Sequence, residues 1–362
     1  MSFKFRVRKF MKLFKSLLVA PATLGLLAPM SATANEVTIS DFNAAEEIAV
    51  TNSRVDGLEA RFNNLEAGSF SETTTASFGV DFLVGAVDGA TSEATAFSYQ
   101  MGIGLETSFT GEDSLAATID IGNGSGAAAG ADGLNFDSTG DVLTLDGLTY
   151  TFPVGGTTVM VGDNTDISAV YTGACAYSAF TDYMGNCGTG SSVGVGGSGV
   201  TAAMSYAFDS GFSIAGGVSS PETAIVGGGT GDVYGIEAAY TADSYGVALA
   251  YADYDDDSTA IGFNGYYAFD FATVSAGYES VDSGTTADGF FLGLSFPEVG
   301  AGTFDIGMGT TGNFAEGQPE YYIYEASYAY PLNDGVTITP GVYIREGSTD
   351  QTGFAVKTSF SF

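Results

Sequence analysis

The chain has 362 residues, of which 43 are acidic and ten are basic, and it contains no histidine. A polypeptide this acidic repels phosphate backbones, so nucleic acid is excluded as a partner. Disorder is disfavoured because 45% of the residues are hydrophobic and 13% are aromatic. Hydrolytic enzymes commonly use a histidine base beside a serine nucleophile, and no pair of carboxylates stands out as a substitute. The sequence therefore predicts neither an enzyme nor a cofactor.

Residues 1–34 have the pattern of a cleaved secretory signal. Six lysines and arginines occupy residues 4–15, a short apolar run follows over 17–28, and Ala32-Thr33-Ala34 supplies the small-x-small cleavage pattern. The apolar run is short and interrupted by proline, which disfavours a membrane anchor. Cleavage leaves four basic residues against 43 acidic ones, a formal net charge of −39. The basic residues that remain are Arg54, Arg61, Arg345 and Lys357.

Residues 35–70 form a linker that contains a short helical pattern. Apolar residues recur at heptad a and d positions, which is typical of a coiled coil. Fewer than three heptads are marginal for an isolated coil, and Gly57 weakens the helix further. The segment is predicted either to form a coil at the foot of a trimer or to lie as a helix along the rim of a barrel. The seam residues are Ile48, Val55, Leu58, Phe62 and Leu65.

From about residue 76 onward, apolar and small residues alternate with period two. A strand places successive side chains on opposite faces, so this alternation predicts strands with one apolar face. After residue 34 the sequence contains no stretch of 18 continuous apolar residues, so no membrane-spanning helix is predicted there. A membrane barrel instead turns one face of each strand to lipid and the other to water. The alternative, a soluble β-sandwich or β-helix, does not need the rows of Tyr and Phe at strand ends, which suit the two membrane interfaces.

The predicted fold is an all-β, transmembrane antiparallel β-barrel that spans residues 71–362. Short turns alternate with longer loops, and the short turns are predicted to be periplasmic. The last strand shows the alternation best, because Phe354, Val356, Phe360 and the terminal Phe362 share its outward side. Sixteen strands are predicted, at residues 76–87, 95–109, 114–122, 141–152, 157–162, 196–208, 212–219, 232–241, 244–252, 259–269, 271–280, 288–296, 302–309, 320–330, 335–345 and 352–362.

The same alternation predicts which charged residues face the lumen. Seven acids and two bases fall on the inward side, and such a wall favours cations by Coulomb attraction. The alternative is that these acids only solvate the interior of the barrel. The predicted pore-lining residues are Asp81, Glu106, Asp120, Glu237, Glu279, Asp305, Glu325, Arg345 and Lys357.

The longest loop runs from about residue 162 to 196 and holds the two cysteines, Cys175 and Cys187. An exported chain meets oxidising conditions, so one disulfide is predicted. Two cysteines without histidine fall short of a zinc site, and no metal is expected. Loops of this length usually have a function. This one is predicted to fold into the barrel and narrow it, or else to pack outside or at the mouth. The predicted constriction residues are Asp163, Asp166, Tyr171, Tyr177, Asp182 and Tyr183.

Four parts of the chain carry a family resemblance: the signal segment Leu18–Ala34, the stretch Val55–Arg61, the strand Leu148–Gly155 and the terminal Phe362. They resemble the corresponding parts of cyanobacterial outer-membrane porins of the OprB-like family, often labelled carbohydrate-selective or iron-uptake porins. The resemblance implies an outer-membrane barrel in contact with lipid, a channel for small ions or solutes, and a homotrimer.

The chain departs from that family between the signal and the coil. Members usually carry a surface-layer-homology domain there, whereas Asn35 to Arg54 gives only about twenty residues, too few for a folded module. The resemblance therefore does not imply that this chain is anchored to peptidoglycan. The predicted function is a water-filled channel for passive diffusion of small hydrophilic solutes, with a structural or adhesive barrel of closed lumen as the alternative. Inorganic ions, sugars and iron species all stay open as solutes.

Overall fold

The computed structural model describes residues 74–90, 93–124, 136, 139–226 and 231–362. Several predictions fall outside these residues and stay predictions. They are the signal peptide 1–34, the linker 35–70 and its coiled-coil residues Ile48, Val55, Leu58, Phe62 and Leu65. Within the described part, no helix has both the length and the apolar character needed to cross a membrane.

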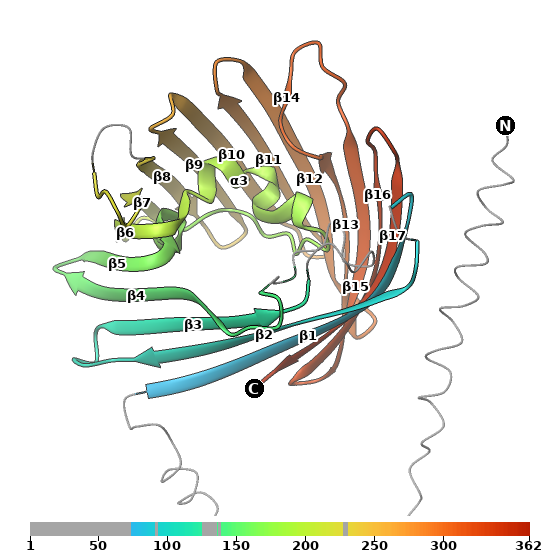
Figure 1. The fold of residues 1–362 in the computed structure, drawn as a ribbon, viewed down its shortest axis with the longest axis horizontal. Coiled ribbons are helices and arrows are strands. Elements are labelled where there is room, and N and C mark those ends of the chain that lie inside the picture. Colours follow the sequence, from blue (N-terminus) through green and yellow to red (C-terminus); the bar gives the residue numbers. More distant parts are fainter. Residues whose placement is uncertain (1–73, 91–92, 125–135, 137–138, 227–230) are drawn as a thin grey trace, which may run out of the picture. The chain divides into compact units, whose positions relative to one another are not determined.

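The described strands form one antiparallel sheet that closes on itself as a barrel (Figure 1). Closure comes from β1, which pairs with β2 on one side and with β17 on the other. The two-residue β14 (Phe314–Ala315) pairs with β12, within the connection between β13 and β15, so 16 strands make up the wall. The predicted 16-stranded barrel is confirmed. The wall strands are β1 (Thr74–Asp88), β2 (Ala96–Thr107), β3 (Ser114–Gly122), β4 (Thr144–Val154), β5 (Thr157–Asp166), β6 (Gly196–Ala207), β7 (Phe212–Ser220), β8 (Val233–Thr241), β9 (Tyr245–Tyr254), β10 (Ser258–Ala268), β11 (Thr273–Asp282), β12 (Thr286–Val299), β13 (Gly302–Thr310), β15 (Tyr322–Asn333), β16 (Val336–Arg345) and β17 (Gln351–Ser361).

The alternation of large and small residues explains how each strand divides between the two faces of the wall. Along β9, Val247 and Leu249 are exposed on the outer face, whereas Ala248 and Ala250 are buried toward the interior. Large apolar side chains therefore cover the outside of the barrel. Small side chains on the inside of β9 leave room for other parts of the chain.

Aromatic rings gather where the strands meet the short turns. From β7 to the β10–β11 turn, each ring contacts the next, with centroids 4.6 to 6.5 Å apart. Such a belt suits the boundary between lipid and water, because each ring has an apolar body and the tyrosines add a polar tip. The rings in order are Phe212, Tyr240, Tyr245, Tyr267, Phe269 and Phe271.

The turn between β2 and β3 is organised by one carboxylate, Asp113, which is 7% exposed. Its Oδ1 accepts hydrogen bonds from the backbone N–H groups of Phe109 and Thr110, at 2.9 and 2.8 Å. Its Oδ2 accepts one from the Tyr150 hydroxyl at 2.7 Å, which ties the turn to β4. The Thr110 N–H and then the Tyr150 hydroxyl stabilise the charged form, and they hold the pKa of Asp113 well below its usual range.

The structure corrects the boundary between β5 and the long loop. The strand was predicted to end at residue 162, but it continues to Asp166. Asp163 pairs with Leu148 of β4, and Thr165 pairs with Gly199 of β6, so the polar residues still join the sheet through their backbones. Side-chain polarity does not end a strand when its backbone keeps partners on both sides. The register shifts around Asn164, whose φ of 50° marks the irregularity.

Candidate functional site

The connection from β5 to β6 folds into the barrel. It contains the short helices η3 (Ile167–Val170), η4 (Asp182–Gly188) and α3 (Gly190–Val193), which lie inside the ring of strands in Figure 1. We call residues 167–195 the inner loop. Its backbone bonds to inward side chains of β8, β10, β11 and β15. The inner loop therefore occupies part of the lumen.

Inward glycines make room for the inner loop along the wall. A Cβ on Gly277 would lie far inside van der Waals contact of the Cys187 carbonyl oxygen, and one on Gly341 would collide with the ring of Phe180. Because any side chain would push the loop away, these strands need glycine where the loop approaches. The glycines that carry such contacts with the inner loop are Gly235, Gly262, Gly277, Gly293, Gly307 and Gly341. We call this set the glycine track.

A disulfide closes the middle of the inner loop. Cys175 and Cys187 are joined across a Cα–Cα distance of 5.7 Å, with 12 residues of sequence separation. Asn186 and Cys187 have φ values of 52° and 54°, in the left-handed region that costs energy for residues other than glycine. Cys187 is fully buried, so the covalent bond and the surrounding wall together hold this turn.

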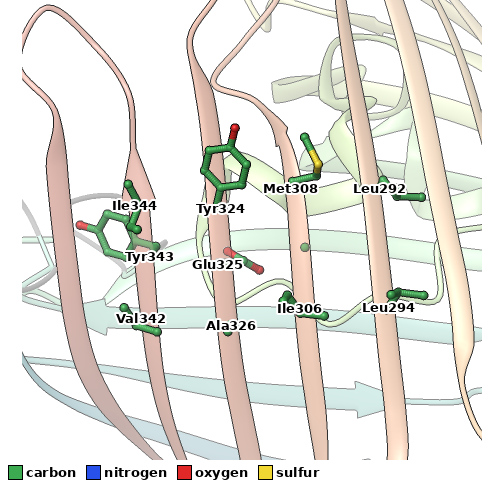
Figure 2. Close-up of a pocket in the computed structure, with 11 residues that line it drawn as sticks. Leu292, Leu294, Ile306, Met308, Tyr324, Glu325, Ala326, Val342, Tyr343 and Ile344 are labelled. Atoms are coloured by element: carbon green, nitrogen blue, oxygen red, sulfur yellow. The ribbon is translucent and has the colours of Figure 1, made fainter.

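Glu325 of β15 holds the tip of the inner loop. One carboxylate oxygen accepts bonds from the Tyr177 hydroxyl at 3.0 Å and the Phe180 N–H at 2.8 Å. The other accepts bonds from the N–H and hydroxyl of Thr181, at 2.8 and 2.6 Å. Four donors thus converge on a side chain that is 3% exposed. Figure 2 shows Glu325 beside the outer-face residues of the neighbouring strands, which include Ile306.

Glu237 of β8 and Asn264 of β10 hold the first half of the inner loop. Glu237 is 1% exposed and accepts bonds from the N–H groups of Thr172 and Gly173, the shorter at 2.7 Å. The Asn264 side-chain oxygen accepts a bond from the Ala174 N–H at 2.9 Å. Neighbouring N–H groups of the loop therefore find acceptors on the wall, as buried backbone groups require.

Glu279 of β11 holds the last part of the inner loop. Its Oε1 accepts bonds from the N–H and the hydroxyl of Ser192, at 2.7 and 2.8 Å. Its Oε2 accepts a bond from the Asn313 side-chain amide at 3.0 Å, which brings in the connection between β13 and β15. Glu279 is 2% exposed, so loop and connection together cover it.

An apolar cluster fills the interior between the inner loop and strands β12 to β1. Tyr177 packs on Phe291 with ring centroids 4.9 Å apart. Phe136, from the connection between β3 and β4, belongs to the same cluster. This side of the lumen is packed with side chains. The largest members are Leu83, Val87, Phe136, Tyr177, Phe180, Met184, Phe291, Ile323 and Tyr343.

Strands β2 to β4 are covered less than the rest of the wall, although Ser98 at the loop end of β2 is only 1% exposed. None of the described residues of β2, β3 and β4 belongs to the apolar clusters formed with the inner loop. Apart from Gln100 and the acids, inward residues here are small or hydroxylated, such as Ala116 and Thr118 of β3 and Thr149 of β4. We call the inward face of β1 to β4 the open wall, although Leu83 and Val87 at the loop end of β1 belong to the cluster. Part of the space that remains inside the barrel lies beside this wall, where Gln100 of β2 lines a cavity of about 180 Å³.

Three of the predicted pore-lining acids lie on the open wall. Asp81 accepts a bond from the Gln100 side chain at 2.8 Å, and Glu106 accepts one from the Ser114 hydroxyl at 2.7 Å. Asp120 lies on β3, level with Gly102 of β2. All three keep solvent exposure. They can meet ions in the lumen.

The other four acids of the predicted lining are covered. Glu237, Glu279, Asp305 and Glu325 point inward, as the alternation predicts, but they are between 1% and 3% exposed. The inner loop lies over this part of the wall, which the alternation within strands cannot reveal. The prediction that these four line the aqueous lumen is therefore corrected.

Both predicted basic residues lie on the inward face near the inner loop. Lys357 of β17 and Asp182 of η4 line a cavity of about 180 Å³, together with Gln100 of β2. Arg345 of β16 donates a hydrogen bond to the Tyr183 hydroxyl, and its guanidinium lies 5.1 Å from the centre of that ring. Asp182 is thus exposed on the loop side of this cavity, whereas Tyr183 packs against the apolar cluster.

The other predicted constriction residues have different places. Asp163 lies in β5 on the outward side, because it pairs with the outward Leu148. Asp166 ends β5 and accepts a bond from the Ser168 hydroxyl. Tyr177 is buried in the apolar cluster. Tyr171 lines a cavity of about 560 Å³ between the inner loop and β8 to β10. Of the six, Asp182 is the one that lines the cavity beside Lys357 and Gln100, and a constriction at this place stays a prediction.

Sequence reasoning missed two groups of residues in this site. Asn264 binds the inner loop, yet an isolated Asn in a strand gives no signal of that role. The glycine track did leave a signal, because glycine recurs at inward positions of several strands where the period-two pattern allows any small residue. Glycine inside a strand often marks close approach of another backbone.

Sequence comparison finds a curated relative that matches part of the chain. No family model matches the chain. A curated relative, the uncharacterized protein alr4550 of Nostoc sp. (strain PCC 7120), is 35% identical over 156 residues. That match covers 38% of this chain and only 27% of the relative, so the chain spans about a quarter of the relative's length.

Solved porins have the same architecture. A high-pH structure of Pseudomonas putida OprB superimposes with a TM-score of 0.63 at 12% identity, over 80% of this chain and 94% of that one. A triple mutant of the Rhodopseudomonas blastica porin gives a TM-score of 0.55 at 16% identity, over 80% of this chain and all of that one. The chain therefore has the fold of a porin barrel.

Proposed function

We propose that the chain is an outer-membrane porin, a water-filled channel for passive diffusion of small hydrophilic solutes and ions. The observation that carries this proposal is the inner loop, which covers one side of the lumen and leaves most of the open wall exposed. Barrels of about 16 strands are wide enough to hold an aqueous channel. A loop that narrows such a barrel without filling it leaves a passage of limited bore.

We further propose an OprB-like porin that is exported through a cleaved signal and inserted in the outer membrane. The apolar outer wall and its aromatic belt suit contact with lipid. The fold of Pseudomonas putida OprB and the cyanobacterial relative are consistent with this assignment. Residues 35–70 would provide the coil of a homotrimer, with the short turns on the periplasmic side.

The channel is proposed to prefer cations. Asp81, Glu106 and Asp120 lie on the open wall, and Asp182 of the inner loop is exposed and lines a cavity together with Gln100 of β2. Lys357 is the basic residue that shares the cavity with Asp182. An excess of carboxylates along a narrow aqueous path raises the local concentration of cations.

Planar-bilayer recording tests both parts of this proposal. The purified mature protein should give stepwise currents, and the reversal potential in a salt gradient should have the sign of cation permeation. Swelling of liposomes in neutral sugars then measures the size limit. Anion preference would contradict the charge argument while leaving the channel intact.

A structural barrel with a closed lumen is the second candidate. The apolar cluster of Leu83, Phe136 and Phe180 favours it, because it fills one side of the interior. The absence of any single-channel current from correctly folded protein would support this candidate over the porin.

A further inference from the structure

The three covered glutamates differ from the other acids of the lumen in what they contact. Glu237, Glu279 and Glu325 accept hydrogen bonds from the inner loop, and they do so mainly from its backbone N–H groups. Hydroxyls and one side-chain amide supply the remaining donors that contact these carboxylates. A carboxylate that receives several donors stabilises the conformation that presents them together.

The three glutamates bind separate segments of the inner loop. Glu237 holds residues 172–173, Glu325 holds 180–181, and Glu279 holds Ser192. The anchors come from β8, β15 and β11, so they are spread around the wall. Movement of the inner loop away from the wall would break these bonds and leave buried carboxylates without donors, which is costly.

We infer that Glu237, Glu279 and Glu325 are positioning residues that fix the inner loop against the glycine track and so set the bore of the channel, without selecting ions themselves. This inference rests on the proposed channel function. It assigns the covered acids a role different from that of Asp81, Glu106 and Asp120 on the open wall. One set determines how wide the passage is, and the other determines which charge enters it.

Burial explains why the two roles separate. Glu237, Glu279 and Glu325 are at most 3% exposed, so an ion in the lumen cannot contact them. The electric field of these buried carboxylates extends into the aqueous lumen, where dissolved salt at about 0.1 M screens charges beyond about 10 Å. Loss of one anchor therefore affects the geometry of the passage more than its charge.

The test compares Glu325→Gln with Asp120→Asn, which removes one acid from the open wall. Single-channel conductance, its spread and voltage-dependent closure report the geometry, and the reversal potential reports ion preference. In Glu325→Gln, the side-chain amide would face the Thr181 N–H, so one donor loses its acceptor and the loop loosens. We expect broader conductance levels and closure at lower voltage, with an unchanged reversal potential. Asp120→Asn should shift the reversal potential and leave the conductance spread unchanged.

A second variant keeps the test valid if Glu325→Gln does not fold. Thr181→Val has nearly the same shape and removes the hydroxyl donor to Glu325 without changing any charge. It should also broaden the conductance levels at constant reversal potential. The inference is overturned if Glu325→Gln shifts the reversal potential as Asp120→Asn does while conductance stays uniform, or if both loop variants behave as the wild type. Failure of the wild type to conduct would instead remove the proposed function.

Discussion

Strands β2 to β4 and strands β10 to β16 have similar outer faces and different inner faces. Both present apolar side chains outward, such as Leu148 on β4 and Leu292 on β12. Inside, β10 to β16 carry five of the six glycines of the glycine track and the anchors Glu279 and Glu325, and the inner loop covers them. The open wall carries small hydroxylated residues and acids that keep solvent exposure. Every strand thus presents an apolar outer face. The inner faces differ, because β10 to β16 support the inner loop and the open wall borders the proposed channel.

The largest expected effect on the covered side comes from the disulfide. Replacing Cys175 and Cys187 together by Ser should lower the free energy of unfolding by about 2–4 kcal/mol, because the unfolded chain regains the freedom that the cross-link removed. Urea unfolding of the protein in lipid vesicles measures the change. Ser178→Ala, an exposed change in the same loop, is the matched control and should unfold as the wild type does. Equal stability of the double variant and the wild type would mean that the inner loop is held without its cross-link.

Replacing one inward glycine by alanine on each wall tests whether the two walls differ in packing. Gly277→Ala should cost about 1–3 kcal/mol of stability, because the added Cβ collides with the Cys187 carbonyl on the covered side. Gly79→Ala on the open wall has no atom within 4 Å of the added Cβ and should leave stability nearly unchanged. The same urea titration compares the two. A Gly79→Ala variant as unstable as Gly277→Ala would show that the two walls do not differ in packing.

The β2–β3 turn should give a smaller effect that depends on pH. The folded pKa of Asp113 lies below its unfolded value, so its stabilisation is present above the unfolded pKa, near 4, and is lost as the pH falls toward the folded pKa. Asp113→Asn should therefore unfold at lower urea than the wild type at neutral pH, and the difference should shrink in acid. Urea midpoints between pH 7 and pH 3 check this. A difference that grows in acid would have the wrong sign.

The smallest effect on stability is expected on the open wall. Glu106→Gln removes an exposed carboxylate and should change the free energy of unfolding by no more than about 0.5 kcal/mol. Its effect should instead be a weaker cation preference, measured as a smaller reversal potential in a salt gradient. A clear loss of stability together with an unchanged reversal potential would place Glu106 among the structural acids.

Local patterns predicted the strands and the direction of their side chains. The alternation identified all 16 strands and placed Glu325 on the inward face. It could not reveal that Thr181, 144 residues away in sequence, covers that carboxylate. Nor could polarity show that β5 continues through Asp163, because backbone pairing with β4 decides where that strand ends. Contacts between distant segments decide which inward residues meet water, and a single strand carries no record of them.

Cysteine accessibility tests the division between the two walls most directly. Thr118→Cys places a thiol on the open wall, whereas Ser275→Cys places one on the covered side, where Ser275 is 1% exposed. The native cysteines are joined in a disulfide and do not compete for reagent. A charged methanethiosulfonate reagent should react rapidly with Thr118→Cys and reduce its current, and it should leave Ser275→Cys unmodified with full current. Rapid reaction at Ser275→Cys with no reaction at Thr118→Cys would contradict the account.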